Sequence, residues 1–326
     1  DSTAVYQITL TADSIKVSTQ GKNFGLFSKL AFVGTNAAVL KIKRLYPAKA
    51  AKLYPNNLFV EVQNSKLKCV NAVTLEKYVA GVVEMEAGPA QSAEYYKVQA
   101  IICRTYVLSN MRRHETENYN VCDHVHCQVY KGDNKLNKFI DLAALQTQNL
   151  VLVDEKSELI TTAFHSNCGG QTCNSEDVWG LKKSYLRSVK DTFCLRQRNA
   201  TWTKVVSKDQ WDQYLKQYCK PCSGDSNLLC CNFEPQERPI NLEIDSTKIP
   251  LKHIRNELKL KSAYFSIQIG TDSLIFNGRG YGHGVGLCQE GAIQMAKLGI
   301  KYTDILHFYY KQVDIINLNQ LHFFKE

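Results

Sequence analysis

Glycine occupies every second position of one segment near the end of the chain, from Gly278 to Gly286. Side chains alternate between the two faces of an extended strand, so one face of this segment is expected to be bare backbone. Repeated glycine weakens a strand interior and indicates that another chain or a ligand approaches the bare face closely. The other face would carry Arg279, Tyr281, His283 and Val285. A tight crossing of the chain and a ligand platform both fit this pattern.

The composition is that of an ordinary globular protein. Of its 326 residues, 44% are hydrophobic and 22% are charged, which suits a sizeable core. The apolar runs are too short to span a bilayer, and no signal-like leader precedes the first strand pattern. We therefore expect no transmembrane segment. We also expect the chain that starts at Asp1 to be a mature or trimmed form.

Cysteine is frequent, with twelve residues in the chain. An even and high number of cysteines favours disulfides in an exported protein. By spacing alone, one group also fits a four-thiolate zinc site, although its adjacent cysteines favour disulfides there. This group consists of Cys219, Cys222, Cys230 and Cys231.

Basic residues outnumber acidic ones by 40 to 31, which gives a formal charge of +9. This balance favours an anionic partner. The positive charge is dispersed along the chain, and no nucleic-acid-binding motif is found, so we expect no nucleic acid partner.

The patterning along the chain predicts an α+β fold. Residues 1–70 alternate β-forming residues between turn residues and form a β-rich N-terminal module. Helical periodicity predicts helices from Thr74 to Gly88 and over 92–113, and residues 150–164 resemble a hairpin that delivers His165 at a strand end. A mixed helix and antiparallel-sheet core is then expected over 71–194 and 251–326, with a cysteine-rich insertion or subdomain over 195–250.

Five segments resemble the stage II sporulation protein D (SpoIID/LytB) family of bacterial cell-wall proteins. The glycine-rich segment GRGYGHGVGLCQEGA, residues 278–292, is similar to that family's signature. The other four segments are 78–106, 122–132, 165–172 and 175–180, in the family's order. The resemblance implies a secreted or envelope-associated lytic transglycosylase or a related wall protein.

The resemblance places the catalytic carboxylate on Glu86, in the register set by Tyr78 and Gly81. Cleavage of a glycosidic bond requires an acid that stays protonated near neutral pH, and nearby apolar residues favour this state. In a lytic transglycosylase the same carboxylate can then accept the proton of the muramic acid C6 hydroxyl, so that a 1,6-anhydro ring closes without water. Glu84 is expected to point away, because two helical residues are about 200° apart. Ala87 stands where the family usually has methionine.

The resemblance also marks candidate substrate-binding residues. On the second helix these are Lys97 and Arg104, seven positions apart and therefore on one face, beside the motif residues Gln99 and Tyr106. The strand-end motif adds His165 and Ser166, and the glycine-rich segment adds Tyr281 and His283. The alternative for each of these side chains is a structural role without substrate contact, either exposed to solvent or buried in the core. The family commonly has serine at position 168, so a disulfide between Cys168 and Cys173 is expected as a local variation.

Cys122 and Cys127 lie close to His114 and His126, which together supply the four ligands of a tetrahedral zinc site. Zinc is known in some members of the resembled family. The zinc would be structural or would position substrate, and the proposed chemistry does not require it. A Cys122–Cys127 disulfide is the alternative, and a zinc hydrolase using these residues is a further one.

The resemblance therefore implies a lytic transglycosylase that cleaves MurNAc–GlcNAc bonds, in glycan strands without peptides, with a 1,6-anhydro-MurNAc product. Peptide-free strands expose the lactyl carboxylate of each muramic acid, which suits the basic charge of the chain. A cell-wall amidase would act first. The alternative is a noncatalytic wall-binding protein or amidase activator. In either case the expected location is the extracytoplasmic envelope of a bacterium.

Overall fold

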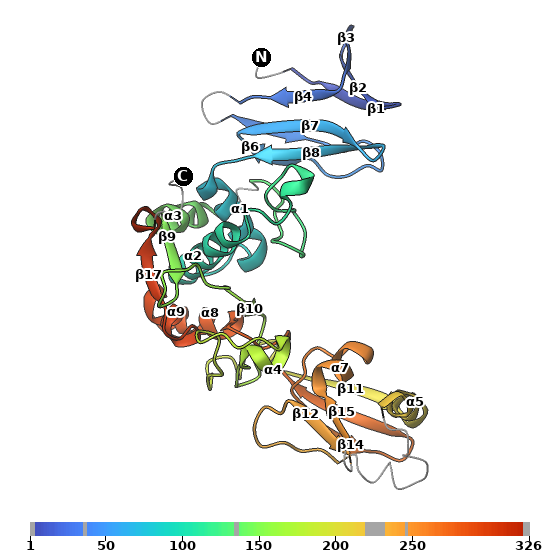
Figure 1. The fold of residues 1–326 in the computed structure, drawn as a ribbon, viewed down its shortest axis with the longest axis vertical. Coiled ribbons are helices and arrows are strands. Elements are labelled where there is room, and N and C mark those ends of the chain that lie inside the picture. Colours follow the sequence, from blue (N-terminus) through green and yellow to red (C-terminus); the bar gives the residue numbers. More distant parts are fainter. Residues whose placement is uncertain (1–3, 35–37, 134–136, 219–231, 245–246, 322–326) are drawn as a thin grey trace. The chain divides into compact units, whose positions relative to one another are not determined.

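The computed structural model describes residues 4–34, 38–133, 137–218, 232–244 and 247–321. The chain forms two compact units, one from residues 1–90 and 99–148, and the other from 91–98 and 149–326. Both units combine helices with antiparallel strands, which confirms the α+β fold class (Figure 1). In the described part of the chain, no helix has the length and apolar character needed to cross a bilayer.

The first unit begins with eight strands in three antiparallel sheets, ordered β1-β2-β3, β4-β7-β8 and β5-β6. Side chains alternate along the strands, and four residues form a common core, namely Ile15, Val17, Leu58 and Val60. The strands predicted from the sequence are all present. Their bounds are β1 Gln7–Thr11, β2 Ser14–Thr19, β3 Lys22–Phe27, β4 Lys29–Phe32, β5 Val39–Ile42, β6 Lys52–Pro55, β7 Asn57–Gln63 and β8 Lys66–Ala72.

Helices follow these strands in the first unit: α1 Leu75–Ala87, the part of α2 Ala93–Ser109 that begins at Gln99, the short η1 Glu115–Glu117, and α3 Lys138–Gln146. Helix α1 ends as predicted, because Gly88 has a φ of +72°. Helix α2 ends four residues before the predicted Arg113. Near its end, the carbonyl oxygen of Tyr106 accepts from the side chains of Ser109 and Asn110.

The second unit contains short sheets built from distant segments. Strand β9 Leu150–Val153 pairs antiparallel with β17 Asp314–Asn317, and β10 Phe164–His165 pairs parallel with β16 Leu287–Cys288. The predicted hairpin over 150–164 is present in short form, as an antiparallel bridge between Val153 and Leu159 with one backbone hydrogen bond on each side of it. The helices are α4 Ser175–Trp179, α5 Lys208–Tyr218, α7 Leu251–Glu257, α8 Gln289–Lys297, α9 Tyr302–Tyr309 and η2 Leu318–Gln320.

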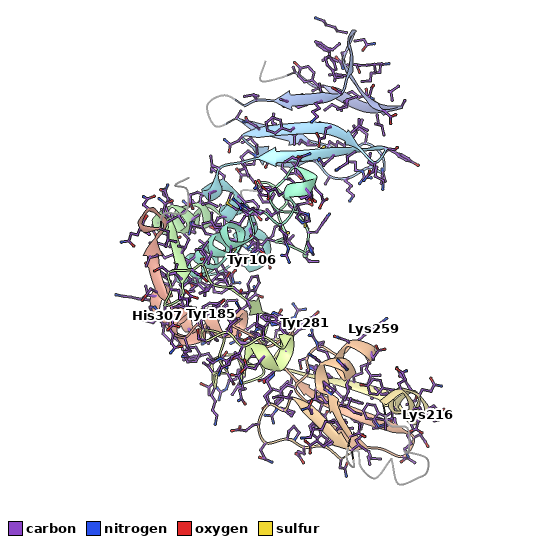
Figure 2. The ribbon with its side chains drawn as sticks, viewed as in Figure 1. Tyr106, Tyr185, Lys216, Lys259, Tyr281 and His307 are labelled. Carbon is purple, nitrogen blue, oxygen red and sulfur yellow. The ribbon has the colours of Figure 1, made fainter. Side chains whose placement is uncertain are left out.

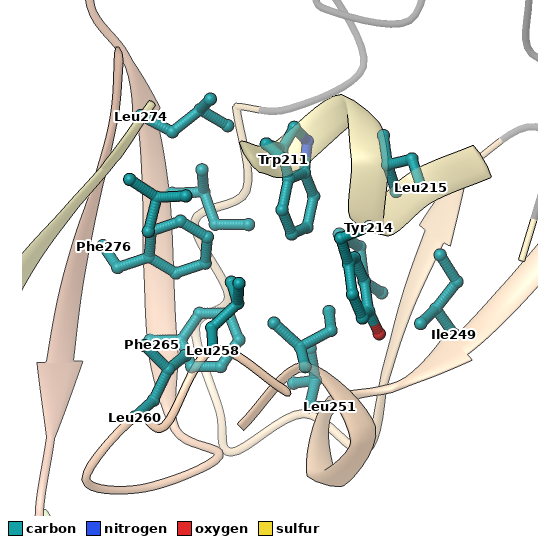
Figure 3. Packing of buried hydrophobic residues seen from close by; sticks show 14 of the residues in the cluster. Trp211, Tyr214, Leu215, Ile249, Leu251, Leu258, Leu260, Phe265, Leu274 and Phe276 are labelled. Carbon is teal, nitrogen blue, oxygen red and sulfur yellow. The ribbon is translucent and has the colours of Figure 1, made fainter. Parts of the chain in front are cut away.

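One large apolar core in the second unit combines residues from both sides of position 250 (Figure 3). Trp211 of α5 packs with its ring 5.6 Å from that of Phe276. The strands around this core are β11 Thr201–Ser207, β12 Asn241–Ile244, β13 Thr247–Pro250, β14 Phe265–Ile269 and β15 Ser273–Arg279, in the sheets β11-β15-β14 and β12-β13. The part of the predicted insertion that is described thus shares a core with the segment that follows it. Cys219, Cys222, Cys230 and Cys231 lie outside the described residues.

The glycine-rich segment is not a continuous strand, which corrects the expectation from its period of two. Strand β15 stops at Arg279, and the four following glycines, Gly280, Gly282, Gly284 and Gly286, all have positive φ angles. The expected close approach is present, because a Cβ atom on Gly280 would lie 2.5 Å from the carbonyl oxygen of Asn167. The protein's own chain is what crosses here, along residues 163–169.

Candidate functional site

Glu86 lies in the last turn of α1 and is half-buried. Burial raises the pKa of its carboxyl group, and a hydrogen bond from the backbone amide of Val129 partly offsets this rise. The amide donor comes from the segment after Cys127, far along the chain from α1. A carboxyl group held in this way can carry a proton at a higher pH than a solvated glutamate.

Buried polar side chains gather in the same part of the first unit. The Tyr78 hydroxyl donates to Oε1 of Gln128 over 3.2 Å, and both side chains are buried. Cys103 of α2 interacts electrostatically with Glu86, and its thiol is also in contact with Gln128 and Gln99. The Nε2 atom of Gln128 has no hydrogen-bond partner in the described part of the chain. Sequence reasoning missed Gln128, although it lies in the cysteine-bearing segment.

Glu84 is on a different face of α1, as its position in the helix predicted. It is buried and lines a small cavity with Lys77 and Ala80 of the same helix and with Asp141 of α3. Glu86 is not among the residues lining that cavity. The two carboxylates therefore have separate surroundings.

The four predicted metal ligands come together in the first unit. The ligand atoms of His114, Cys122, His126 and Cys127 all lie within 4.8 Å of one another. Sγ of Cys127 is 3.5 Å from Nε2 of His114 and 3.7 Å from Nδ1 of His126, which is in turn 3.8 Å from Sγ of Cys122. Two thiolates and two imidazoles form an ordinary zinc donor set, so these residues fit the metal.

The surroundings of this donor set also suit a metal. Glu117 accepts a hydrogen bond from Nδ1 of His114 over 2.6 Å, which leaves Nε2 directed at Cys127. Burial raises the pKa of Cys122, but hydrogen bonds from His124, His126 and Cys127 outweigh burial and lower it to about 6. A thiolate is the form that binds metal. Glu117, three residues after His114, was not predicted.

The two candidate residues of α2 are both engaged within the protein. Lys97 forms an ion pair with Glu94 at 2.7 Å, and its ammonium group lies 5.6 Å from the ring centre of Tyr302. Arg104 is fully buried and forms an ion pair with Glu76. Arg104 also donates to the carbonyl oxygens of Ala100 and Ala144. Arg104 therefore joins α1, α2 and α3 within the first unit.

His165 and His283 lie together in the second unit, with ring centres 5.5 Å apart. Nδ1 of His165 donates to the carbonyl oxygen of Val285 over 3.2 Å, while its buried Nε2 has no hydrogen-bond partner among the described residues. Burial lowers the pKa of His165 well below its ordinary value and lowers that of His283 to about 4. Both rings are therefore neutral near pH 7. The neighbouring Ser166 is half-buried, and its carbonyl oxygen accepts from the Glu290 amide.

An aromatic and cationic surface adjoins these histidines. Tyr281, which is labelled in Figure 2, lies beside Lys261, whose ammonium group is 6.0 Å from its ring centre. The Tyr281 side chain is 45% exposed. Trp179 at the end of α4 is 47% exposed and lies 5.3 Å from the ring of His283. Arg255 is close enough to Tyr281 and His283 to affect their electrostatics. Trp179 lies in the family-like segment 175–180 but was not predicted as a substrate-binding residue.

Arg238 is a second cation near these histidines, and it was missed because its segment was interpreted as an insertion. Its guanidinium group donates to the carbonyl oxygens of Cys168 and Gln171, each over 2.8 Å. A Cβ atom on Gly284 would lie 2.4 Å from that guanidinium group. A side chain at this position would displace the guanidinium group, and the positive φ of Gly284 also favours glycine there.

The cysteines differ from expectation. All eight described cysteines are free, so the structure contains neither the predicted Cys168–Cys173 disulfide nor the alternative Cys122–Cys127 disulfide among its described residues. Sγ of Cys168 instead lies 3.4 Å from Sγ of Cys194, in a buried group that also contains Cys288. The neighbouring Gly169 packs closely against Arg279 and Gly280.

Comparison with known proteins gives one family match and several relatives. Residues 63–153 match the family described as "Stage II sporulation protein". An uncharacterized protein of Brachyspira hyodysenteriae is 31% identical over 272 residues, which cover 82% of this chain and 73% of that protein. The stage II sporulation protein D of Bacillus amyloliquefaciens is 30% identical over 271 residues, which cover 78% of each chain.

A relative with a different name is the amidase enhancer of Bacillus subtilis. It is 27% identical over 285 residues, which cover 71% of this chain and 39% of the enhancer. The matched family segment includes Glu86 and the four cysteine and histidine ligands of the first unit.

Proposed function

Because the chain belongs to the stage II sporulation protein D family, we propose that it acts on the bacterial cell wall as a lytic transglycosylase. Its substrate would be the MurNAc–GlcNAc bond of peptidoglycan glycan strands without stem peptides, and its product a 1,6-anhydro-MurNAc end. The observation that carries this proposal is the half-buried Glu86, whose pKa burial raises.

Glu86 would perform both proton transfers. In its protonated form it donates to the glycosidic oxygen, and the bond from this oxygen to C1 of MurNAc breaks. The resulting carboxylate then accepts the proton of the C6 hydroxyl as the C6 oxygen bonds to C1. The proton count of Glu86 is restored after each turnover, so a second carboxylate and a water molecule are not required. The Val129 amide supports the carboxylate between the two transfers.

The first-unit ligands His114, Cys122, His126 and Cys127 would hold zinc. Bound zinc would fix the loop that contains Cys127, two residues before the amide that donates to Glu86. The role of these residues would then be positional, and Glu86 would still carry the chemistry. This arrangement favours the transglycosylase over a zinc hydrolase.

The surface around Tyr281 in the second unit would bind glycan. Exposed aromatic rings such as Tyr281 and Trp179 present apolar faces to sugars, and Arg255 and Lys261 supply positive charge for lactyl carboxylates. His165 and His283 would offer neutral imidazole groups, and Ser166 a hydroxyl group. Lys97 would support α2 through Glu94. An extracytoplasmic location and an amidase acting upstream complete the proposal.

Product analysis tests this assignment. Peptide-free glycan strands are treated with wild-type protein, with Glu86→Gln and with the matched control Glu84→Gln. The masses of the products are then measured by mass spectrometry. We expect wild-type and Glu84→Gln protein to release fragments lighter by one water than hydrolysis products. Glu86→Gln should be slower by about 10²- to 10⁴-fold. Products with ordinary reducing ends would contradict the transglycosylase assignment.

The amidase enhancer relative favours a second candidate function, in which the chain binds glycan and stimulates an amidase without cleaving glycan itself. This candidate predicts no new ends with wild-type protein, and equal amidase stimulation by wild-type and Glu86→Gln protein. Stimulation that depends on Glu86 would argue for cleavage.

A further inference from the structure

A second group of potential metal ligands lies in the core of the second unit. Cys168, Asp191, Cys194 and Cys288 are all buried, and their ligand atoms lie within 4.8 Å of one another. Sγ of Cys168 is 3.4 Å from Sγ of Cys194 and 3.3 Å from Oδ2 of Asp191. The four residues come from three separate segments, and neither motif nor spacing connects them in the sequence.

We propose that Cys168, Asp191, Cys194 and Cys288 bind one zinc ion in a closed structural site. The ion would have three thiolate ligands and one carboxylate ligand, with no position left for water or substrate. The site is separate from the cysteine and histidine ligands of the first unit. It also goes beyond the proposed glycan cleavage, which does not depend on it.

The size of the group fits a single tetrahedral ion. A Zn–S bond length of about 2.3 Å places two sulfur ligands about 3.8 Å apart. The Cys168 and Cys194 sulfurs are 3.4 Å apart, so a small outward shift of the side chains would admit the ion. Nitrogen is absent from the donor set, and three sulfurs favour zinc over magnesium or calcium.

The carboxyl group of Asp191 accepts from two neutral donors, the Tyr309 hydroxyl and the Cys168 thiol. The side chain is fully buried, and no ion pair with a lysine, arginine or histidine is found for it in the described part of the chain. An ionised carboxylate in such a place is costly unless a cation or a metal compensates for it. A divalent cation between Asp191 and the three sulfurs would provide this compensation.

Hydrogen bonds around the group match those of metal thiolates. The backbone amides of Cys168 and Gly291 point at Sγ of Cys288, over 3.3 Å and 3.4 Å. The Tyr309 hydroxyl donates to Oδ2 of Asp191 over 2.9 Å. Such outer contacts orient metal ligands and stabilise their charge.

A disulfide between Cys168 and Cys194 is the main alternative, since their sulfurs are neighbours. It would use only two of the three sulfurs. It would leave Cys288 with two amide donors directed at its sulfur and Asp191 without a cation. The metal site accounts for all four side chains together.

The proposed ion would join three segments: Cys168 follows β10, Asp191 and Cys194 precede β11, and Cys288 directly precedes α8. These segments adjoin the glycine-rich crossing, where isolated β-bridges pair Cys173 with Val285 and Asn167 with Tyr281. The ion would therefore stabilise the backbone that presents His165 and Tyr281. This gives the site a structural role.

Metal analysis of full-length protein tests the proposal. The parent protein is Cys122→Ser with Cys127→Ser, which removes the first-unit site, and it is purified without chelator. Adding Cys194→Ser should lower its zinc content by one equivalent per chain. The matched control adds Cys173→Ser, a half-buried cysteine outside the group, and should lose no zinc. Equal zinc in the parent and in the Cys194→Ser protein would overturn the proposal.

A second measurement covers the case in which Cys194→Ser fails to fold. Cobalt is exchanged into the folded parent protein, and the sulfur-to-cobalt charge-transfer band is compared with that of the Asp191→Asn variant. We expect a band typical of three thiolates in the parent. Thiols are then alkylated in denaturant without reductant. If the band is missing and the thiols of Cys168 and Cys194 do not react, the two residues form a disulfide and the proposal is wrong. If the band is missing and all thiols react, the group forms neither a metal site nor a disulfide, and the proposal is also wrong. Because both readouts concern metal and thiols, they are independent of glycan cleavage.

Discussion

The Glu117 carboxylate lies 2.6 Å from Nδ1 of His114, on the side of the ring opposite to the Cys127 sulfur. A carboxylate in this position selects the tautomer that leaves Nε2 available to a metal. We predict that Glu117→Gln weakens zinc binding at the first-unit site by about 10- to 100-fold. Competition with a chromophoric chelator measures the zinc affinity. The part of the titration curve that is lost in Cys122→Ser belongs to the first-unit site, and this part should change in Glu117→Gln. The exposed neighbour Glu115→Gln serves as control, and equal affinities in the two variants would contradict the assignment.

Arg104 is predicted to matter for stability. Its replacement by methionine leaves the Glu76 carboxylate, which is 23% exposed, without its cation, at a cost of about 3 kcal/mol of unfolding free energy. Arg104→Lys should restore only part of this loss, because an ammonium group cannot reproduce the planar fork that bonds Glu76 and two carbonyl groups. Denaturant unfolding followed by circular dichroism measures both variants. A stable Arg104→Met protein with weaker glycan binding would instead give Arg104 a substrate role.

Local pattern explains which parts of the fold the sequence predicted. The β1 segment alternates apolar and polar residues, β7 clusters β-forming residues, and α1 has apolar residues at helical spacing followed by Gly88. Each of these elements is specified by its own residues. The first-unit metal ligands were found because Cys122, His126 and Cys127 are neighbours in the sequence. Short-range features of this kind can be identified without knowledge of the fold.

Long-range pairing explains what was missed. The partner of β9 is β17, which begins 161 positions after Val153, and no local pattern specifies this pairing. The same reason hid the buried group of Cys168, Asp191 and Cys288. A period of two in glycine also leaves the backbone conformation open, because glycine adopts positive and negative φ with similar ease. In the structure the positive angles prevail because the chain crosses itself there.

Glu86 is predicted to reduce stability at neutral pH. Burial raises its folded-state pKa, so the folded protein binds this proton more tightly than the unfolded chain, and stability falls as pH rises through the interval between the two values. Glu86→Gln should therefore have a higher unfolding free energy than wild type at pH 7. The difference should vanish at pH values below the ordinary glutamate pKa. Denaturant unfolding of both proteins at several pH values measures it, and a less stable variant at pH 7 would contradict the burial argument.

His283 is predicted to make the second unit sensitive to acid. Burial lowers its pKa from 6.5 to about 4, the Phe164 carbonyl opposes the change, and Arg255 and Arg238 add to it. The stability that this neutral ring contributes is complete above pH 6.5 and is lost as pH falls toward 4, by up to about 1.4 kcal/mol per pH unit. His165, whose pKa is also lowered, contributes with the same sign. Tryptophan fluorescence reports on this unit alone, because Trp179, Trp202 and Trp211 all belong to it. His283→Gln should give a shallower pH dependence, and an unchanged slope would contradict the prediction.

Gly282 and Gly25 form a matched pair that separates backbone strain from packing. Their φ angles are +115° and +104°, but a Cβ atom on Gly282 would lie 2.8 Å from Cβ of His165, while one on Gly25 would meet nothing within 4 Å. Alanine at Gly25 should therefore cost only the backbone conformation, about 1–2 kcal/mol. Alanine at Gly282 should cost about 2–4 kcal/mol, because His165 and its strand must also move. Unfolding is followed by tryptophan fluorescence for Gly282→Ala and by circular dichroism for Gly25→Ala. Equal costs would mean that the crossing at residues 163–169 is loosely packed, and the glycine requirement would then be one of backbone angle alone.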